Sequence, residues 1–161
     1  MFMKRYVLVS LLVIIITLVG CQSNIETIPN AKMFSINVDA PKDLQADELF
    51  IVKGTLVNNS DSTWEVEHGA DMFTYVVYHN GEPVLQDVKL RVVNDIGLMM
   101  SLKPDATYKY DGEGHVNPKN NEFILQAGNY DVVSKAKFRI KHVDKYYEFE
   151  IESQPLKIKV S

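Results

Sequence analysis

Residues 130–152 read YDVVSKAKFRIKHVDKYYEFEIE, and this stretch decides the fold class because apolar and polar side chains alternate along it. The even-numbered positions from Tyr130 to Ile140 share one face of an extended strand, and the other face is largely charged. A second run then alternates Tyr147, Phe149 and Ile151 with glutamates. A period of two residues is typical of half-buried β-strands, so the stretch predicts two neighbouring strands.

Both faces of these two strands agree on how the strands pair. With the hairpin closed at residues 142–145, Phe138 faces Phe149 on the apolar side. On the other side three cations meet three glutamates, in the pairs Lys135 with Glu152, Lys137 with Glu150 and Arg139 with Glu148. A slip of one residue would turn the whole apolar face to solvent, so the sequence predicts this antiparallel register.

Further alternating stretches lie on either side of the hairpin. The sequence predicts strands at residues 34–38, 49–57, 73–79, 88–93, 107–111 and 156–160, with residues 49–57 buried on both faces for part of their length. Asn80-Gly81 predicts a tight hairpin, and Pro83 places the returning strand at a sheet edge. Seven to nine short strands without a convincing helix predict an all-β chain, an immunoglobulin-like antiparallel β-sandwich over residues 33–161.

The residues just before the long strand support the immunoglobulin-like interpretation. Gly128 provides a turn two residues before Tyr130. This resembles a tyrosine corner, in which the tyrosine hydroxyl bonds back to the preceding connection. The alternative is a core tyrosine after a turn glycine, and both interpretations lead to the same fold.

The first twenty-one residues predict export and a lipid anchor. Lys4 and Arg5 form a short basic head, and an apolar run from Tyr6 to Gly20 follows. This is the layout of a secretory signal, and the run is shorter than the ~20 residues that span a bilayer as a helix. Cys21, the only cysteine of the chain, follows Gly20 as in a bacterial lipobox. We expect diacylglycerol on the Cys21 thiol and cleavage before it, which would hold the protein on the outer face of the cell membrane.

Two alternatives are an uncleaved anchor helix and an ordinary signal peptide with an incidental cysteine. Cleavage would remove residues 1–20 and leave a chain long enough for one domain, with residues 21–32 as the lipidated N-terminus and a flexible tether. Because residues 1–20 carry two cations and no acid, cleavage changes the net charge from −4 to −6. A mildly acidic chain lacks the clustered positive charge that nucleic acid binding needs, so nucleic acid is not an expected partner.

The sequence predicts neither an enzyme nor a cofactor. With Cys21 modified, no thiol remains to act as a nucleophile. Ser60, Ser62, Ser101 and Ser134 lie in no recognisable nucleophile motif. The carboxylates offer no pair that stands out from an ordinary acidic loop.

Aromatic side chains are the candidates for recognition of a partner. Trp64 lies in a polar segment, and Tyr75 and Tyr78 lie in the strand predicted at residues 73–79. An exposed tryptophan among loops is a typical anchor of an interface. A tryptophan that closes one end of the core is an equally good interpretation of the same residue.

His68, Met72 and His79 are weak candidates for a copper or zinc site, since imidazole and thioether groups bind these metals. The two histidines flank one predicted strand, so they would lie ~20 Å apart unless the chain bends. Asp111 and Glu113 carry oxygen ligands of the kind that calcium prefers, but the loop lacks the twelve-residue spacing of a calcium-binding loop. The sequence therefore predicts no metal site.

Four short motifs resemble the intracellular proteinase inhibitor (BsuPI-like) family across about residues 50–140. They are VNNS at 57–60, HGADMF at 68–73, LKP at 102–104 and AGNY at 127–130. In that family the corresponding features are an asparagine-rich turn, a Gly-x-x-Φ-x-Φ strand, a Leu-x-Pro-Gly turn and a Gly-x-Tyr strand. The resemblance implies an immunoglobulin-like fold and, as an expectation, inhibition of a proteinase. Asp105 stands where the family has its turn glycine, and no reactive-site residue is carried over.

Three functions follow from these features. The first is a lipid-anchored cell-envelope protein with a non-catalytic binding domain, whose partner is another envelope protein. The second is an exported proteinase inhibitor that blocks a protease with an exposed loop at residues 58–69 or 111–121. The third is an envelope copper chaperone that uses His68, Met72 and His79.

Overall fold

The structure is a computed structural model and describes residues 27–85 and 90–161. Apart from a three-residue 3-10 helix, η1 (Ala31–Met33), every regular element of these residues is a β-strand. The strands are β1 (Phe34–Asp39), β2 (Leu49–Ile51), β3 (Lys53–Asn58), β4 (Trp64–His68), β5 (Phe73–His79), β6 (Glu82–Pro83), β7 (Val92–Val93), β8 (Leu98–Leu102), β9 (Thr107–Lys109), β10 (Val116–Asn117), β11 (Glu122–Ile124), β12 (Gly128–His142), β13 (Lys145–Glu152) and β14 (Leu156–Val160).

The prediction of an all-β, immunoglobulin-like antiparallel sandwich is confirmed. Eight of the strands have five residues or more, within the seven to nine expected, and six additional strands of two or three residues bring the number in the described residues to fourteen. These short strands arise where the chain pairs briefly at an edge and then bends away. Among the described residues, no helix is long and apolar enough to cross a membrane.

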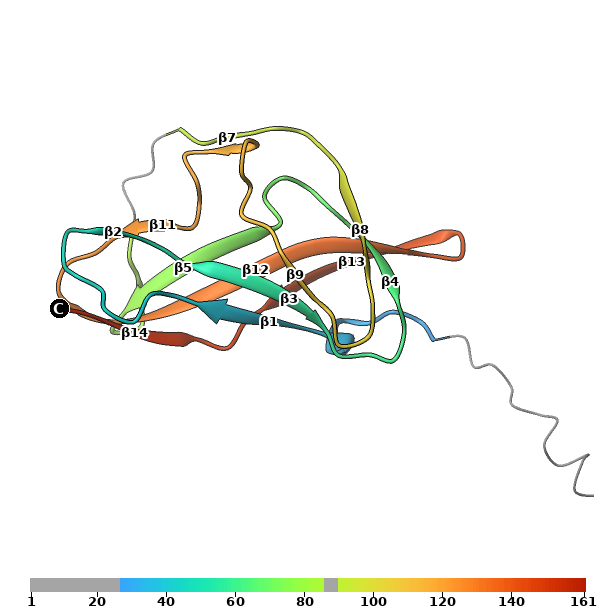
Figure 1. The fold of residues 1–161 in the computed structure, drawn as a ribbon, viewed down its shortest axis with the longest axis horizontal. Helices are drawn as coiled ribbons and strands as arrows, with labels where there is room; N and C mark the ends of the chain where they lie inside the picture. The colour runs from blue at the N-terminus through green and yellow to red at the C-terminus, as the bar shows by residue number, and fades with distance from the viewer. Residues whose placement is uncertain (1–26, 86–89) are drawn as a thin grey trace, which may run out of the picture.

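β12 is the central strand of the larger layer and changes partners along its length (Figure 1). Its first half pairs with β5 on one edge and β14 on the other. Its second half pairs with β4 on the same edge as β5, and with β13 on the same edge as β14. One strand of fifteen residues therefore organises the whole layer. On the edge of β12 that pairs with β5 and β4, the layer continues to β6 beyond β5 and to β8 beyond β4.

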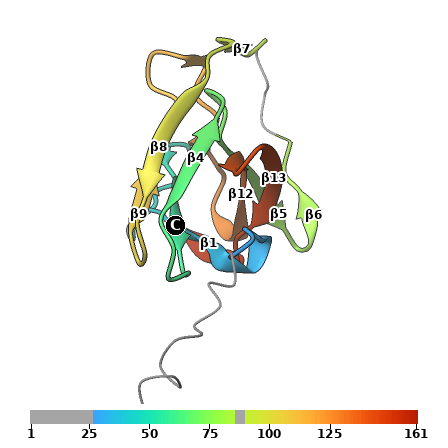
Figure 2. The ribbon, with the colours of Figure 1, turned by 90° about the vertical axis from the view of Figure 1, so that its right-hand side faces the viewer.

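A second layer, in the order β1-β3-β9, packs against this sheet (Figure 2). Two apolar clusters fill the space between the layers. The first joins residues such as Phe34 and Leu56 to Phe138, and the second joins Phe50 and Phe123 to residues such as Val132. Two short sheets, β2–β11 and β7–β10, complete the described fold.

The predicted hairpin register is confirmed in every pair. Phe138 lies opposite Phe149, and Lys135 lies opposite Glu152. All even-numbered residues of β12 from Tyr130 to Ile140 are buried, as the alternation predicted. Because the buried face permits only one alignment, the register of β12 and β13 can be predicted from the sequence.

The structure corrects the strand predicted at residues 49–57. The chain divides at Val52, so β2 pairs with β11 and β3 pairs with β1 and β9. Val52 itself is fully buried, and its N–H donates to the carbonyl oxygen of Asn121 at 2.9 Å. A continuous apolar run cannot indicate where a strand changes sheets, because every position in it is compatible with burial.

The two turn predictions are confirmed. Asn80 and Gly81 have φ angles of 52° and 85° and join β5 to β6, and Pro83 lies in the edge strand β6. The Tyr130 hydroxyl donates to the carbonyl oxygen of Gln126 at 3.0 Å, so the tyrosine corner forms. Part of the strand predicted at residues 88–93 is present as β7. Residues 88 and 89 lie outside the described part of the chain.

The segment expected to be a flexible tether is partly packed. Pro29 is buried, Asn30 caps η1, and the carbonyl oxygen of Met33 accepts from the N–H of Asn59 at 2.7 Å. Packing contacts of the described chain therefore include Pro29, four residues before the predicted domain start at Met33. The first described residues lie toward one end of the long axis, and β2, β11 and the C-terminus lie at the other (Figure 1).

Candidate functional site

The predicted lipidation site, Cys21, lies outside the described residues. The signal peptide at residues 1–20 and the first residues of the tether lie outside them as well. Lipidation and export therefore stay predictions from the sequence.

Trp64 is a core residue. It lies in β4, a strand that the sequence did not predict because the neighbours of Trp64 are polar. Only 5% of the Trp64 surface is exposed. Its indole Nε1 donates to Ser60 Oγ at 2.9 Å, which satisfies the one polar atom of the ring. The interpretation as a tryptophan that closes the core holds, and the interpretation as an exposed anchor is wrong because the ring is enclosed.

Tyr75 and Tyr78 are both partly buried in β5. The Tyr75 hydroxyl accepts a hydrogen bond from the N–H of Gly54 at 2.7 Å, and burial raises the pKa of Tyr75 to about 12. Tyr75 thus joins β5 to β3 across the sandwich and has a structural contact of its own. Tyr78 lies opposite Pro83 at the sheet edge, beside the hairpin turn.

The structure does not bring the three candidate metal ligands together. His68 and Met72 are buried, and Met72 belongs to the apolar core. His79 lies at the other end of β5, where its ring packs against Tyr130 with 4.9 Å between ring centroids. In residues 27–85 and 90–161, no three histidine, cysteine or acidic side chains are grouped so that they could hold a metal ion.

His68 instead contacts two tyrosines, Tyr108 through a hydrogen bond and Tyr110 through ring packing. Its Nδ1 lies 2.7 Å from the carbonyl oxygen of Gly69, and its Nε2 lies 2.9 Å from the Tyr108 hydroxyl. Because a carbonyl only accepts, Nδ1 carries the proton and Nε2 accepts from Tyr108. The Tyr110 ring packs on the same imidazole at 5.0 Å. Burial lowers the pKa of His68, although the bond to Gly69 partly opposes this shift.

A cleft of about 660 Å³ lies beside this cluster, where β12 changes its partner from β5 to β4. Its charged lining includes Glu67, Asp71, Asp95, Lys137 and Arg139. Arg139 is already engaged there, since its Nη2 lies 2.8 Å from a Glu67 carboxylate oxygen. The cleft is thus a polar depression with an ion pair across its wall.

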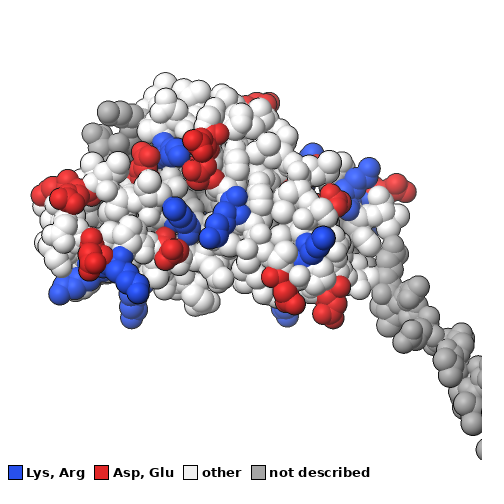
Figure 3. Space-filling model, viewed as in Figure 1, with Lys and Arg blue, Asp and Glu red and all other residues white. Residues whose placement is uncertain are grey.

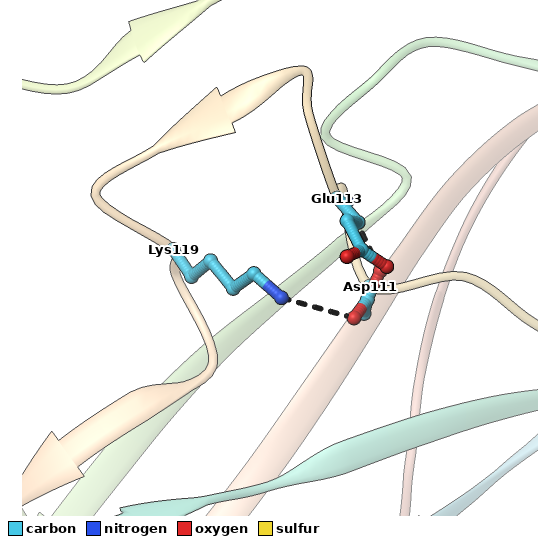
Figure 4. Close-up of polar contacts among 3 residues, drawn as sticks. All are labelled: Asp111, Glu113 and Lys119. Carbon is cyan, nitrogen blue, oxygen red and sulfur yellow. Dashed lines mark hydrogen bonds and ion pairs between the residues drawn. The ribbon is translucent and has the colours of Figure 1, made fainter.

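The loop that follows β9 is held closed by its own charges (Figure 4). Asp111 accepts from Lys119 Nζ at 3.1 Å with one carboxylate oxygen and from the N–H of Glu113 at 3.0 Å with the other. Burial alone would raise the pKa of Asp111, but these bonds outweigh it and hold the pKa below its usual range. Both carboxylate oxygens are occupied by donors of the chain itself, so the arrangement is that of a braced loop and not of a cation site.

The other open cleft, of about 500 Å³, lies beside β2. Residues 39–41 and 43–45 form one wall, and residues 48–51 with Lys53 form the other. Asp39, Asp43 and Glu48 give its rim an acidic character that Lys53 only partly balances. We call this the β2 cleft.

Next to the β2 cleft, the two-stranded sheet β2–β11 exposes an apolar face. Leu49 lies directly opposite Ile124, and their exposed fractions are 59% and 55%. The neighbouring Ile51 is 39% exposed, whereas Phe50 and Phe123 face inward and are buried. The sequence missed this face because residues 49–52 are all apolar, so their pattern does not distinguish an outward from an inward side chain.

Charge is distributed evenly over the face of the molecule seen in Figure 3. Lysine and arginine side chains are interspersed with aspartate and glutamate side chains there. This face has no basic stripe of the kind that tracks a nucleic acid backbone.

In comparisons with known proteins, no family model and no curated protein matches the chain. Among solved structures, the chain is similar to the CARDB domain of the PF1109 protein from Pyrococcus furiosus, which was solved in complex with di-metal ions. The two are 10% identical, the match covers 79% of this chain and 91% of that chain, and the TM-score is 0.39. At this distance the likeness carries no argument, and the fold assignment rests on the strands and layers described above.

Proposed function

We propose that this protein is a non-catalytic binding module of the cell envelope, held on the outer face of the membrane by a lipid on Cys21. The observation that carries the binding role is the exposed apolar pair Leu49 and Ile124, which lies beside an open cleft. Exposed apolar side chains that adjoin one another on a rigid sheet mark interaction surfaces, because water contact with them is unfavourable.

The position of this surface suits a tethered protein. The described chain begins toward one end of the long axis, and β2 and β11 lie at the other end (Figure 1). If the N-terminus is lipidated, the apolar pair and the β2 cleft point away from the bilayer. A partner in the envelope would reach them without displacing lipid.

The anchor is tested by metabolic labelling of intact cells with radiolabelled palmitate. Wild-type protein is expected to carry label and to sediment with membranes, and Cys21→Ala is expected to lose both. Equal labelling of the two proteins would overturn the anchor.

The binding role is tested by crosslinking in intact cells, with Cys21 kept. Replacing both Leu49 and Ile124 with serine is expected to abolish a specific crosslinked band. Val143→Ser is the matched control, since Val143 is 64% exposed but lies at the tip of the β12–β13 hairpin. A band that survives the double substitution would overturn the proposed binding surface.

Inhibition of a proteinase is a second candidate, and the braced loop at residues 111–121 favours it. Besides the Asp111–Lys119 ion pair, Arg91 Nε donates to the carbonyl oxygen of Pro118 at 3.2 Å. A loop held rigid from both sides loses little entropy on binding. The other predicted loop, residues 58–69, is excluded because it contains the buried strand β4. Titration of envelope proteases with the purified protein tests this candidate, and no inhibition at micromolar concentration would remove it.

A further inference from the structure

We propose that the free edge of β2 binds an extended, basic segment of a partner protein, which adds to the β2–β11 sheet as a third strand. This inference deepens the proposed binding role and rests on it, in that it names the surface and the chemistry of the partner. Three observations carry it: the direction of the β2 backbone groups, the cleft beside them and the charge of its rim.

The hydrogen-bond pattern shows where the β2 backbone points. The N–H of Val52 donates to the carbonyl oxygen of Asn121 at 2.9 Å, one position beyond the pairs of the β2–β11 ladder. In an antiparallel ladder, bonded and non-bonded pairs alternate, so Phe50 and Phe123 form the next bonded pair. Leu49 and Ile51 therefore direct their N–H and C=O groups away from β11.

No other strand of the described residues occupies that side of β2. The sheet contains β11 and β2 alone, and no backbone hydrogen bond outside the ladder involves Leu49 or Ile51. Two residues thus offer unpaired donors and acceptors along one edge. Such an edge is a template for another extended chain, which gains main-chain hydrogen bonds as it adds.

The β2 cleft provides room for that chain. Its lining includes β2 and residues 39–41 and 43–45 but no residue of β11, so the cleft lies on the free side of β2. The opposite wall ends at Leu44, which forms an isolated bridge with Val160 and is buried. An incoming strand would lie between a fixed wall and the open edge, with Leu49 and Ile51 exposed for contact with its apolar side chains.

The charge of the rim selects the partner. Asp39, Asp43 and Glu48 are exposed and face the cleft with Lys53 as the only lining cation. Basic side chains on the incoming segment would complement these carboxylates and speed its association. A second copy of this chain is disfavoured, because pairing β2 with β2 would bring the same acids together.

The test uses the full-length protein in detergent micelles and a nine-residue probe peptide of alternating lysine and valine, acetylated and amidated at its ends. Binding is measured by calorimetry, and the amides of Leu49 and Ile51 are followed by hydrogen exchange. We expect the probe to bind and to slow exchange at both amides at least tenfold. The same peptide with glutamate in place of lysine is expected to bind at least tenfold more weakly.

Ile51→Pro removes an outward N–H without touching the β2–β11 ladder, and it is expected to weaken probe binding at least tenfold. Glu122→Pro is the matched control, since Glu122 lies opposite Ile51 and its N–H points outward on the far edge of β11, and it is expected to leave the affinity within twofold. The triple substitution of Asp39, Asp43 and Glu48 by their amides tests the rim without any change to the backbone, and should also weaken binding at least tenfold.

Three results would overturn the inference. They are no binding of the probe to the wild-type protein, equal affinity for wild type and Ile51→Pro, and unchanged amide exchange. Sedimentation that shows a dimer of the wild type and a monomer of Ile51→Pro would assign the edge to a second copy and also overturn it. None of these readouts depends on Cys21, so failure of the lipid anchor and failure of the β2 edge are distinguished.

Discussion

At the scale of single residues, Asn58 holds the turns at one end of the sandwich. The side chain is fully buried, and its Nδ2 donates to the carbonyl oxygens of Ser62, Leu102 and Lys103 at 2.7–3.0 Å. Its Oδ1 accepts from both the N–H and the hydroxyl of Ser60. One amide therefore satisfies polar groups of two loops that are distant in sequence.

We predict that Asn58→Ala lowers the free energy of unfolding by about 2–4 kcal/mol, because buried carbonyls lose their donor. The loss is measured by urea denaturation. The neighbouring Asn59 is exposed and bonds only to Ser35 through its side chain, so Asn59→Ala should cost less than about 0.5 kcal/mol. Equal losses for the two variants would contradict this role of Asn58.

Asp105 occupies a position at which a turn glycine was expected from the sequence. Its φ angle is 57°, in the left-handed region that favours glycine. Its N–H also donates to the carbonyl oxygen of Asn58 at 2.9 Å, so the backbone is held in this conformation. The chain carries an aspartate where a turn glycine was expected, and the structure shows that the backbone there has the positive φ that favours glycine.

His68 makes the stability of the protein depend on pH. Its pKa is lowered in the folded state, so acid protonates the unfolded chain first and favours it. The contribution is complete above the unfolded pKa of about 6.5 and is lost as the pH falls below that value. We predict that the wild type loses stability over the pH range below about 6.5, as measured by urea denaturation at each pH. His68→Gln should reduce the change in stability over this pH range, whereas His115→Gln should leave that change as it is in the wild type.

At the scale of elements, the β12–β13 hairpin shows that the register of two strands does not by itself determine which charged side chains form ion pairs. The pairing is as the sequence predicted, and Lys135 forms its ion pair with Glu152 at 2.6 Å. Arg139 instead pairs with Glu67 of β4 and lies over the Tyr146 ring, 4.6 Å from its centroid. The strand β4 was not predicted, so its carboxylate was absent from the sequence-based pairing.

We predict that double-mutant cycles follow the structure and not the hairpin pairing. The coupling energy between Arg139 and Glu67 should be about 0.5–1 kcal/mol, since Glu67 is largely sheltered while Arg139 is half exposed. The coupling between Arg139 and Glu148 should lie below about 0.3 kcal/mol. The cycles are built from thermal or urea denaturation of single and double alanine variants, and the reverse order of the two couplings would contradict the assignment.

At the scale of the whole molecule, the two layers are in close contact at Gly54. A Cβ at this position would lie 2.7 Å from the Phe73 ring and 2.9 Å from the Tyr75 hydroxyl. The N–H of Gly54 donates to that hydroxyl at 2.7 Å. One glycine in β3 therefore permits both the contact between layers and the hydrogen bond across them.

We predict that Tyr75→Phe lowers the free energy of unfolding by about 1–3 kcal/mol, because the buried N–H of Gly54 loses its acceptor. Gly54→Ala should cost at least as much, since the buried Phe73 ring must move. Tyr78→Phe in the same strand is the control and should cost less than about 0.5 kcal/mol. Differential scanning calorimetry measures the stability of all three variants. If Tyr75→Phe is as stable as the wild type, the packing of the layers does not depend on this hydrogen bond.

The sequence alone determined the class of fold, the β12–β13 register, the Asn80-Gly81 hairpin, the edge position of Pro83 and the tyrosine corner. Each of these depends on local alternation or on the backbone preference of one residue, and such information is written in neighbouring positions. The predictions for Cys21 come from the same source, and they stay predictions.

Only the tertiary structure decided which side of each apolar run faces solvent. Trp64 is buried although its neighbours are polar, and Leu49 is exposed although three apolar residues follow it. The reason is that burial depends on which strand lies opposite, and β2 and β4 pair with segments thirty or more residues away. The β2 cleft and its free edge arise from the same long-range pairing, which a pattern of neighbouring residues does not contain.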